Sequence, residues 1–465
     1  MFIGKHDNAP PKTIPSTNTN KVIRSNTLIF GPAGSGKTTR LANATIKDAF
    51  DAGHSICFVG DGSLSSMIPD LVAHGYAIKR LDLKHPENSD SWPCLKELSG
   101  ADPKETQTRA NIFSKCVLEA TDGIADDIQD KEFAKIAISH LLNAMLLYLY
   151  ANRSSKDSMN SLFKLLEERD TDKVFAQEDC PDYAKNEYQM FCVGAGGRKE
   201  FYTDMLRKKV AAYQDEFGRT KTANEENSIE FSQLAEKKTA LIMTVLDNAR
   251  SVYANLAMSF LFRDLFETAD QAKDGKCKVP VQIVMDEFAN VSPIPNIEKL
   301  LAVSRGRAIF STIVVQDPMQ ILALYGDVGA EILANCYRRI DAGIECAARH
   351  LFETTASKKD PIFDSAEMSL FLAISYADSE KRYEPMHSNT EELRHRSLHD
   401  IIGSVDKVLT AALTANNPMD YLENFCHTIN PEGENAFFSF KMASANNRII
   451  FVKDLKERTR AYLES

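Results

Sequence analysis

The residues with the most definite chemistry form a short glycine-rich stretch, Gly31–Thr38, with the sequence GPAGSGKT. It fits the pattern G-x-x-x-x-G-K-[ST], in which glycines let the backbone curl around a polyphosphate with its N–H groups pointing inward. In that pattern Lys37 reaches the β- and γ-phosphates and Thr38 holds Mg²⁺. The stretch therefore predicts a site for ATP and Mg²⁺. Its expected nucleotide-binding residues are Gly31, Gly34, Ser35, Gly36, Lys37, Thr38 and Thr39.

The segments on either side of this stretch support a nucleotide site. Residues 27–30 form a short apolar run that predicts a buried strand, and residues 38–50 have the pattern of a helix. The positive N-terminal end of that helix would face the phosphates. The alternative is a chance glycine-rich turn, which average residue frequencies give only roughly a few times in a hundred chains of this length.

An acidic pair supplies the second half of the predicted site. Residues 281–285 are mostly apolar and are followed directly by Asp286 and Glu287. At the end of a strand, Asp286 can act on Mg²⁺ through metal-bound water, and Glu287 can polarise the attacking water. Many strands end in acidic residues, so this pattern is weak alone. Paired with the glycine-rich stretch it predicts ATP hydrolysis, with Thr38 and Asp286 at the metal and Glu287 as the catalytic carboxylate.

Three further polar residues occupy positions from which they can contact a γ-phosphate. Gln316 follows the apolar run 309–315, where it would sense the phosphate or orient water. The alternative for Gln316 is an amide that caps a loop. Arg305 and Arg307 end the predicted helix 296–304, and either can be an arginine finger. Equally, each can compensate the negative end of that helix.

The composition sets broad limits on the protein class. The chain has 465 residues, 43% hydrophobic and 26% charged, which suits a soluble protein of two or three domains. A net charge of −10 argues against a whole surface devoted to nucleic acid but allows a locally basic channel. The nine cysteines form no CxxC or zinc-type spacing, so we expect reduced thiols in a cytoplasmic chain.

The order of apolar runs predicts an α/β fold with a mostly parallel sheet. Strands are expected at 27–30, 55–59, 77–83, 239–246, 281–287, 309–315 and 338–344. Helical patterns occupy 108–120, 131–150, 158–168, 183–191 and 200–217, where no strand is expected. We therefore predict a nucleotide-binding domain made of residues 21–102 and 225–355, interrupted by an inserted all-α domain at 103–224.

The two ends of the chain and its most apolar segment are less informative. Residues 1–20 are polar and proline-rich and predict a flexible tail. Residues 356–465 carry weak signals, with strands expected at 436–440 and 448–452 and a helix at 453–463. They either complete the nucleotide-binding domain or form a separate part. The run 133–151 contains Lys135 and His140, which favours a buried helix over a membrane span. We expect no transmembrane segment and no signal peptide.

The last part of the helical segment is rich in basic residues. These are Arg198, Lys199, Arg207, Lys208, Lys209, Arg219 and Lys221. They fit either a solvated helix face or a contact to DNA phosphates or an acidic protein.

One stretch of the chain, 286–326, resembles the type IV secretion coupling proteins, which are conjugative DNA-transfer ATPases. The resemblance rests on DEFAN at 286–290, IPNIEKLLA at 294–302, SRGR at 304–307, VVQ at 314–316 and ALYG at 323–326. Two further segments, 82–93 and 228–241, resemble that family, and together the resemblance covers residues 26–352.

The resemblance implies a RecA-like P-loop NTPase motor interrupted by an all-α domain, assembled as a hexamer around a DNA channel. Lys37 and Thr38 then correspond to the Walker A ligands, and Asp286 and Glu287 to the Walker B acids. Arg305 matches the finger that enters the neighbouring subunit's site, and Gln316 the sensor. The implied partners are single- or double-stranded DNA, a relaxase or relaxosome, and secretion channel components.

Two departures and two rival functions accompany the resemblance. The family usually begins with transmembrane helices, so we expect a natural soluble form or one lacking the anchor, held at the inner face of the cell membrane through partners or a separate anchor. The turn 60–63, GDGS, replaces an Asp-Pro-Lys-Gly-Glu-like turn. The rivals are a soluble hexameric DNA translocase of the chromosome-segregation type and a non-motor, nucleotide-regulated substrate receptor.

Overall fold

The structure is a computed structural model that describes most of the chain. The described residues are 2–3, 12–13, 25–60, 63–92, 94–100, 102–121, 131–152, 159–167, 171–211, 228–245, 251–344, 347–348, 351, 370–375, 377–378, 398–426 and 448–464.

A seven-stranded parallel sheet forms the centre of the molecule, with the strand order β5-β6-β4-β7-β8-β3-β9. The strands are β3 (Thr27–Phe30), β4 (Ser55–Gly60), β5 (Ala77–Asp82), β6 (Thr239–Thr244), β7 (Val281–Met285), β8 (Ile309–Val315) and β9 (Arg338–Asp341). Five of them, β3, β4, β6, β7 and β8, are buried along their whole length. Such strands have nearly continuous apolar sequences because both faces of a parallel sheet are covered. The expected α/β class with a parallel sheet is confirmed.

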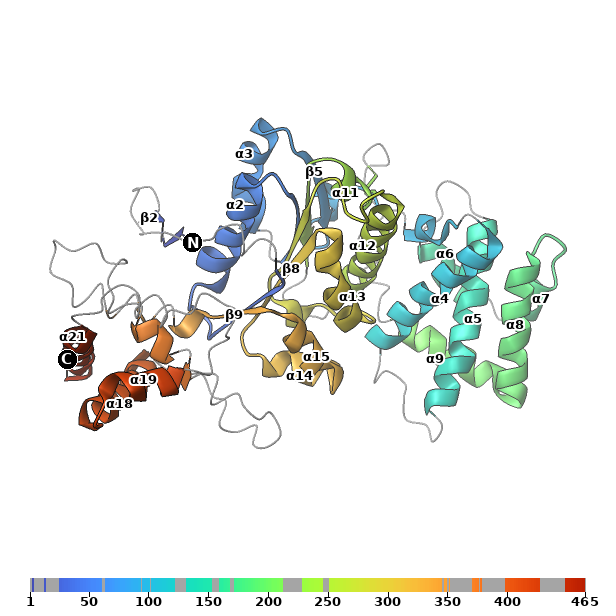
Figure 1. Cartoon of the computed structure of the whole chain (residues 1–465). Helices are drawn as coiled ribbons and strands as arrows, with labels where there is room; N and C mark the ends of the chain where they lie inside the picture. The colour runs from blue at the N-terminus through green and yellow to red at the C-terminus, as the bar shows by residue number, and fades with distance from the viewer. Residues whose placement is uncertain are drawn as a thin grey trace.

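Helices cover both faces of this sheet (Figure 1). One face packs against α2 (Asn43–Asp51) and α3 (Ile68–Ala73), through a cluster that includes Ile46 and Leu71. The other packs against α12 (Val252–Gln271) and α13 (Ile297–Ser304). The remaining described helices of this part are α11 (Gln233–Glu236), α14 (Met319–Tyr325) and α15 (Val328–Asn335), and short turns are η2 (Ser63–Met67), η3 (Pro86–Asn88), η4 (Cys94–Leu98), η8 (Phe288–Asn290) and η9 (Arg305–Arg307).

A helical insertion lies beyond α12, between β5 and β6 in the sequence (Figure 1). Its described elements are α4 (Pro103–Ala120), α5 (Lys131–Ala151), α6 (Met159–Glu167), α7 (Thr171–Phe175), α8 (Asp182–Ala195), η5 (Gly196–Arg198) and α9 (Lys199–Ala211). Among the described helices, α5 is long and apolar enough to cross a membrane, but 61% of its most apolar stretch is buried. Burial of this kind is typical of a core helix, which here packs between its neighbours in the insertion.

The C-terminal elements form a hydrophobic cluster of their own. They are α18 (Leu398–Thr414), α19 (Pro418–Cys426) and α21 (Arg448–Glu464), and they pack with residues that include Ile344, Leu351 and Phe371. Near the N-terminus, where we expected a loose tail, β1 (Phe2–Ile3) pairs with β2 (Lys12–Thr13) in an antiparallel sense.

Two expectations about strands are wrong. Residues 448–452 begin α21 instead of forming a strand, because the burial of Val452 and Leu455 in the C-terminal cluster outweighs the β-branched preference of the segment. The strand β9 ends at Asp341, and residues 342–344 are helical, since Asp341 Oδ1 accepts hydrogen bonds from the amides of Gly343 and Ile344. The expected strand at 436–440 lies outside the described residues.

Candidate nucleotide-binding site

The strand order brings the predicted site residues to one edge of the sheet. In a parallel sheet all strands end at the same edge, and here β7, β8 and β3 are successive neighbours. They are followed directly by Asp286, Gln316 and Gly31. The amide of Gly31 donates to the carbonyl of Gln316 at 3.1 Å, which joins the ends of β3 and β8. Gln316 therefore lies at the strand end between the glycine-rich loop and the acids.

The loop from Gly31 to Gly36 has the backbone that its glycines allow. The φ angles are +148° at Gly31, +78° at Gly34 and +85° at Gly36, a region that other residues rarely adopt. A Cβ atom at Gly31 would lie 3.0 Å from the amide nitrogen of Gly343 and 3.1 Å from Ser35 Oγ. The glycine at 31 is thus required by both conformation and space.

The loop leads into a helix whose first turn is wider than an α-helix. This π-helical turn, η1 (Lys37–Ala42), continues directly into α2, so the expected helix 38–50 is confirmed with an altered start. The free amides of such a helix start favour an anion. Thr38 is partly buried and Thr39 is exposed.

Lys37 lies over its own loop and close to the acidic pair. Its Nζ donates to the carbonyl of Gly31 at 2.8 Å and to that of Pro32 at 3.0 Å. Burial lowers the pKa of Lys37, while the charges of Asp286 and Glu287 act to raise it. The lysine and both acids therefore belong to one electrostatic site.

The two acids have different surroundings. Asp286 is only 3% exposed, and its amide donates to the carbonyl of Val59 at 2.7 Å, which joins β7 to β4. A Cβ atom at Gly60 would lie 3.1 Å from the Cβ of Asp286, so the glycine at the end of β4 leaves space for this carboxylate. Glu287 is exposed, and its Oε2 accepts a hydrogen bond from Asn290 Nδ2 at 2.5 Å.

These groups fit a Mg²⁺-bound polyphosphate. Among the described residues, the buried Oγ of Ser35, within the loop, has no hydrogen-bond partner. In the same part of the chain, the Lys37 ammonium donates to two loop carbonyls, which phosphate oxygens can replace. The Thr38 hydroxyl and the Asp286 carboxylate are oxygen ligands of the kind that Mg²⁺ binds.

The two candidate arginines lie at the opposite edge of the sheet, because they precede β8 whereas the glycine-rich loop follows β3. Arg307 forms an ion pair with Asp270 at 2.8 Å. Arg305 is exposed, and within the described part of the chain no hydrogen bond or ion pair engages its guanidinium. The two arginines thus have different surroundings, with Arg307 paired within the chain and Arg305 exposed.

Several basic residues of the insertion have partners within the protein. Lys199 pairs with Asp172 at 3.0 Å, and Arg207 and Lys208 both pair with Asp204. Lys209, which is 1% exposed, donates to the carbonyl of Thr121. These contacts favour a locally paired helix surface over a free phosphate-binding one. Arg219 and Lys221 lie outside the described residues.

One residue of the site escaped the sequence reasoning. Asn290 belongs to the DEFAN motif, but nothing in its spacing indicated a contact with Glu287. A polar amide three residues after a carboxylate, at the end of a short turn, is the signal that would have found it.

Comparison with known proteins identifies a matching segment and a matching fold. Residues 280–346 match a family model described as the TraM recognition site of TraD and TraG. The bacterial conjugative coupling protein TrwBdeltaN70, in a trigonal form with sulphate, shares 13% identity with a TM-score of 0.52 over 72% of this chain and 74% of that chain. No curated protein sequence matches this chain.

Two nucleotide complexes of the plasmid coupling protein TrwB are similar to the same extent. The complex with the ATP analogue ADPNP has 13% identity and a TM-score of 0.52, covering 72% of this chain and 74% of that chain. The complex with ADP and Mg²⁺ has 13% identity and a TM-score of 0.51, covering 72% and 75%. At this identity the likeness establishes the fold, which is the expected RecA-like α/β domain with a helical insertion. The matched segment contains the acidic pair, Arg305 and Gln316, and the fold is that of the conjugative coupling proteins.

Proposed function

We propose that this protein is an ATP-dependent coupling protein of conjugative DNA transfer, which recruits a relaxase bound to single-stranded DNA and drives it to a type IV secretion channel. The observation that carries the proposal is the meeting of the glycine-rich loop, Gln316 and the pair Asp286–Glu287 at the ends of three neighbouring strands. The family model, described by its TraM recognition site, supports a relaxosome partner.

Each residue of the site has a separate role in ATP hydrolysis. The amides at the start of η1 and the Lys37 ammonium bind phosphate oxygens, in place of the carbonyls that Lys37 now contacts. Thr38 and Asp286 would hold Mg²⁺, which supplies positive charge against the phosphates when bound. Glu287 accepts a proton from the attacking water, and Gln316 orients that water or senses the γ-phosphate.

Arg305 completes the site from a second subunit. The length of β8, seven residues, separates Arg305 from the edge that carries its own glycine-rich loop, which is about 20 Å at 3.3 Å per residue. A guanidinium cannot bridge that distance within one chain. A ring of subunits, which we propose is a hexamer, places it against the neighbour's nucleotide.

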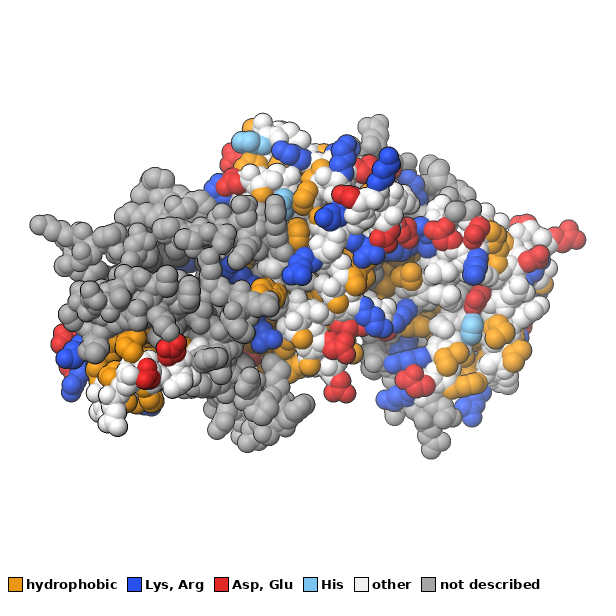
Figure 2. Space-filling view, in the orientation of Figure 1, with side chains coloured by type: hydrophobic (Ala, Val, Ile, Leu, Met, Phe, Trp, Pro, Cys, Tyr) orange, Lys and Arg blue, Asp and Glu red, His pale blue; other side chains and the backbone are white. Residues whose placement is uncertain are grey.

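We assign cargo recognition to the helical insertion. It carries no phosphate-binding loop of its own among the described residues, and it exposes apolar side chains on the face shown in Figure 2. Over its whole described surface, the large exposed apolar side chains of the insertion are Phe133, Ile136, Met190, Val193 and Phe201. Replacing Ile136 and Val193 with serine should weaken relaxase binding and leave ATP binding unchanged.

The decisive experiment measures ATP turnover with and without single-stranded DNA, together with the mass of the assembly. A coupling motor should hydrolyse ATP faster with DNA and form a ring. ATP binding without DNA-stimulated turnover would favour the receptor alternative. Stimulation by duplex DNA, with none by single strands, would favour the chromosome-segregation type of translocase.

A further inference from the structure

The carboxylate of Glu287 is hydrogen-bonded to Asn290, a residue of its own turn. Besides the 2.5 Å hydrogen bond from its side chain, Asn290 donates from its backbone amide to the carbonyl of Glu287 at 2.8 Å. The two bonds close the short turn η8. The direction of the Glu287 carboxylate therefore depends on where Asn290 lies.

The backbone of Glu287 is held in an unusual conformation. Its φ is 54° and its ψ is 48°, in the left-handed region that side chains other than glycine rarely adopt. Such a residue keeps its conformation only when its surroundings impose it. The turn closed by Asn290 is one such constraint, at the residue expected to activate water.

Asn290 is in turn attached to the start of α12. The amide of Ser251 donates to the carbonyl of Asn290 at 3.0 Å, and the amide of Ser292 donates to the carbonyl of Ser251 at 3.2 Å. Ser251 and Val291 form a parallel β-bridge. Ser251 also caps α12, since its Oγ accepts a hydrogen bond from the amide of Ala254 at 3.1 Å. The turn and the helix start are thus one connected unit.

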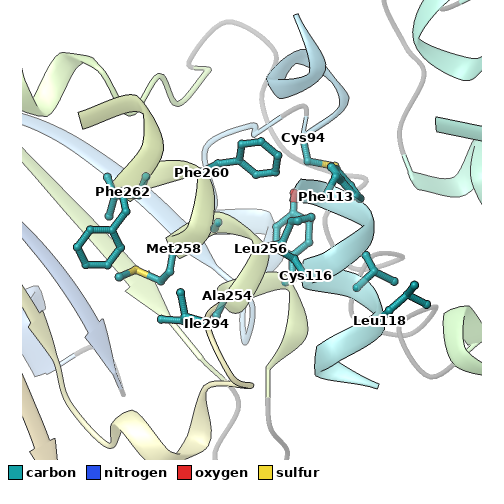
Figure 3. Close-up of a cluster of buried hydrophobic side chains, with 14 of the residues drawn as sticks. Cys94, Phe113, Cys116, Leu118, Ala254, Leu256, Met258, Phe260, Phe262 and Ile294 are labelled. Atoms are coloured by element: carbon teal, nitrogen blue, oxygen red, sulfur yellow. The ribbon is translucent and has the colours of Figure 1, made fainter. Parts of the chain in front are cut away.

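Side chains of α12 hold the chain that follows the turn. Asn255 Nδ2 donates to the carbonyls of Ser292, at 3.0 Å, and Pro293. Figure 3 shows Ile294 beside Ala254 and Met258 of the same helix. A shift of α12 would therefore carry the segment 290–294 with it.

The outer side of α12 contacts the helical insertion. Arg109 of α4 pairs with Glu267 at 2.8 Å, and the rings of Phe113 and Phe260 lie with centroids 5.8 Å apart. Figure 3 shows Phe260 directed toward Phe113 and Cys94, on the side of α12 that faces α4. One helix thus contacts the insertion along one side and the catalytic turn at its N-terminus.

We infer that Asn290 is a positioning residue for Glu287, and that its own place is set by α12, so that the helical insertion and the water-activating carboxylate are mechanically linked. The inference rests on the proposed function and extends it. It connects the helical insertion, to which we assign cargo recognition, with the ATP site through α12 and Asn290. Asn290 does not touch nucleotide; it acts through the carboxylate.

Two variants of Asn290 test the positioning role. Asn290→Ala should lower kcat about ten-fold, as loss of a supporting hydrogen bond commonly does, with KM for ATP unchanged. Asn290→Asp keeps the size of the side chain but has no N–H donor for Glu287, so it should lower kcat at least as far as Asn290→Ala. A merely structural asparagine would not lower kcat while KM for ATP stays unchanged.

A matched control distinguishes an effect on the Glu287 carboxylate from a general loosening of the segment 290–294. Asn255→Ala loosens the same segment without touching Glu287, and it should lower kcat less than Asn290→Ala does. In a Glu287→Gln background, Asn290→Ala should cause no further loss. If the wild type hydrolyses ATP and Glu287→Gln does not, yet folded Asn290→Ala and Asn290→Asp have wild-type kcat, the inference is overturned while the proposed function stands.

The link to the insertion has its own test. Arg109→Ala, which removes the contact to Glu267, should lower DNA stimulation of turnover about three-fold in the otherwise native chain. Combined with Asn290→Ala, it should have no further effect, because Asn290→Ala already removes the connection between α12 and Glu287. Equal effects in both backgrounds would show that the insertion does not act through Asn290.

Discussion

Arg307 and Asp270 form a two-bond ion pair, from Nε to Oδ1 at 2.8 Å and from Nη2 to Oδ2 at 3.1 Å. The guanidinium also lies over the ring of Phe266, 4.8 Å from its centroid. Arg307 therefore fastens η9 to α12 within one subunit. Arg305, two residues earlier and exposed, remains for a contact outside the subunit.

We expect Arg305→Ala to leave ATP affinity nearly intact and to cut turnover sharply, because arginine fingers contribute roughly 10³–10⁵ in rate. Lysine should restore little, since it lacks the planar fork. Mixing Arg305→Ala with Lys37→Ala subunits should restore some activity, because a mixed ring contains intact interfaces.

The measurement is hydrolysis against mixing ratio, with subunits shown to exchange. Arg307→Ala is the control: it should lower the thermal midpoint but give no such complementation with Lys37→Ala. If mixed rings never exceed the two inactive parents, Arg305 does not act on a neighbour, and the helix-end interpretation holds for it too.

Lys37→Ala should abolish ATP turnover while the fold stays intact. Lys37 supplies charge to the phosphates, and among the described residues its Nζ donates to loop carbonyls, so the core loses nothing. Circular dichroism and steady-state hydrolysis check both halves of this expectation. Unchanged turnover in a folded variant would remove the glycine-rich loop from the site.

Glu287→Gln should permit ATP binding but stall hydrolysis, because an amide cannot accept the proton of the attacking water. The glutamine has the same size and keeps an oxygen that can accept the Asn290 hydrogen bond. Single-turnover kinetics with bound ATP separate binding from chemistry. Normal hydrolysis by this variant would place the base on another residue.

A buried carboxylate between α12 and α4 predicts a pH dependence of stability. Burial, and secondarily the charge of Asp264, raises the pKa of Glu97 to about 7, although Trp92, Arg263 and Arg109 act to lower it. The native state then binds more protons than the unfolded chain between the ordinary glutamate pKa and about 7. The contribution of Glu97 to stability is therefore present at low pH and lost as pH rises through that window.

Glu97→Gln should reduce the fall of the free energy of unfolding with rising pH. It should raise that free energy at pH 8 by about 1–3 kcal/mol, since one pKa unit corresponds to about 1.4 kcal/mol. Thermal melts of both proteins from pH 5 to pH 8 test it. Glu267→Gln, at a half-exposed neighbour in the same network, is the control and should leave the slope nearly unchanged. Parallel slopes for wild type and Glu97→Gln would exclude Glu97 as the titrating group.

The sequence by itself determined the backbone conformation of the glycine-rich loop and the class of the fold. The glycines act through local backbone geometry, which their spacing specifies. The central strands were equally visible, because burial on both faces makes them continuous apolar runs that end in a few polar residues. Periodicity predicted five helices of the insertion, although α4 begins five residues earlier than expected and α7 was not foreseen. Residues 212–217 of the last expected helix lie outside the described residues.

Only the tertiary structure decided what depends on contacts between distant segments. The neighbouring order β7-β8-β3 places Gln316 between the loop and the acids, and sequence order does not contain it. Arg307 differs from Arg305 only because Asp270 lies beside it. Residues 448–452 have a strand-like composition, yet packing in the C-terminal cluster makes them helical. Asn290 contacts Glu287 because the turn between them folds back on itself. Their hydrogen bond depends on the distance and angle that this turn sets.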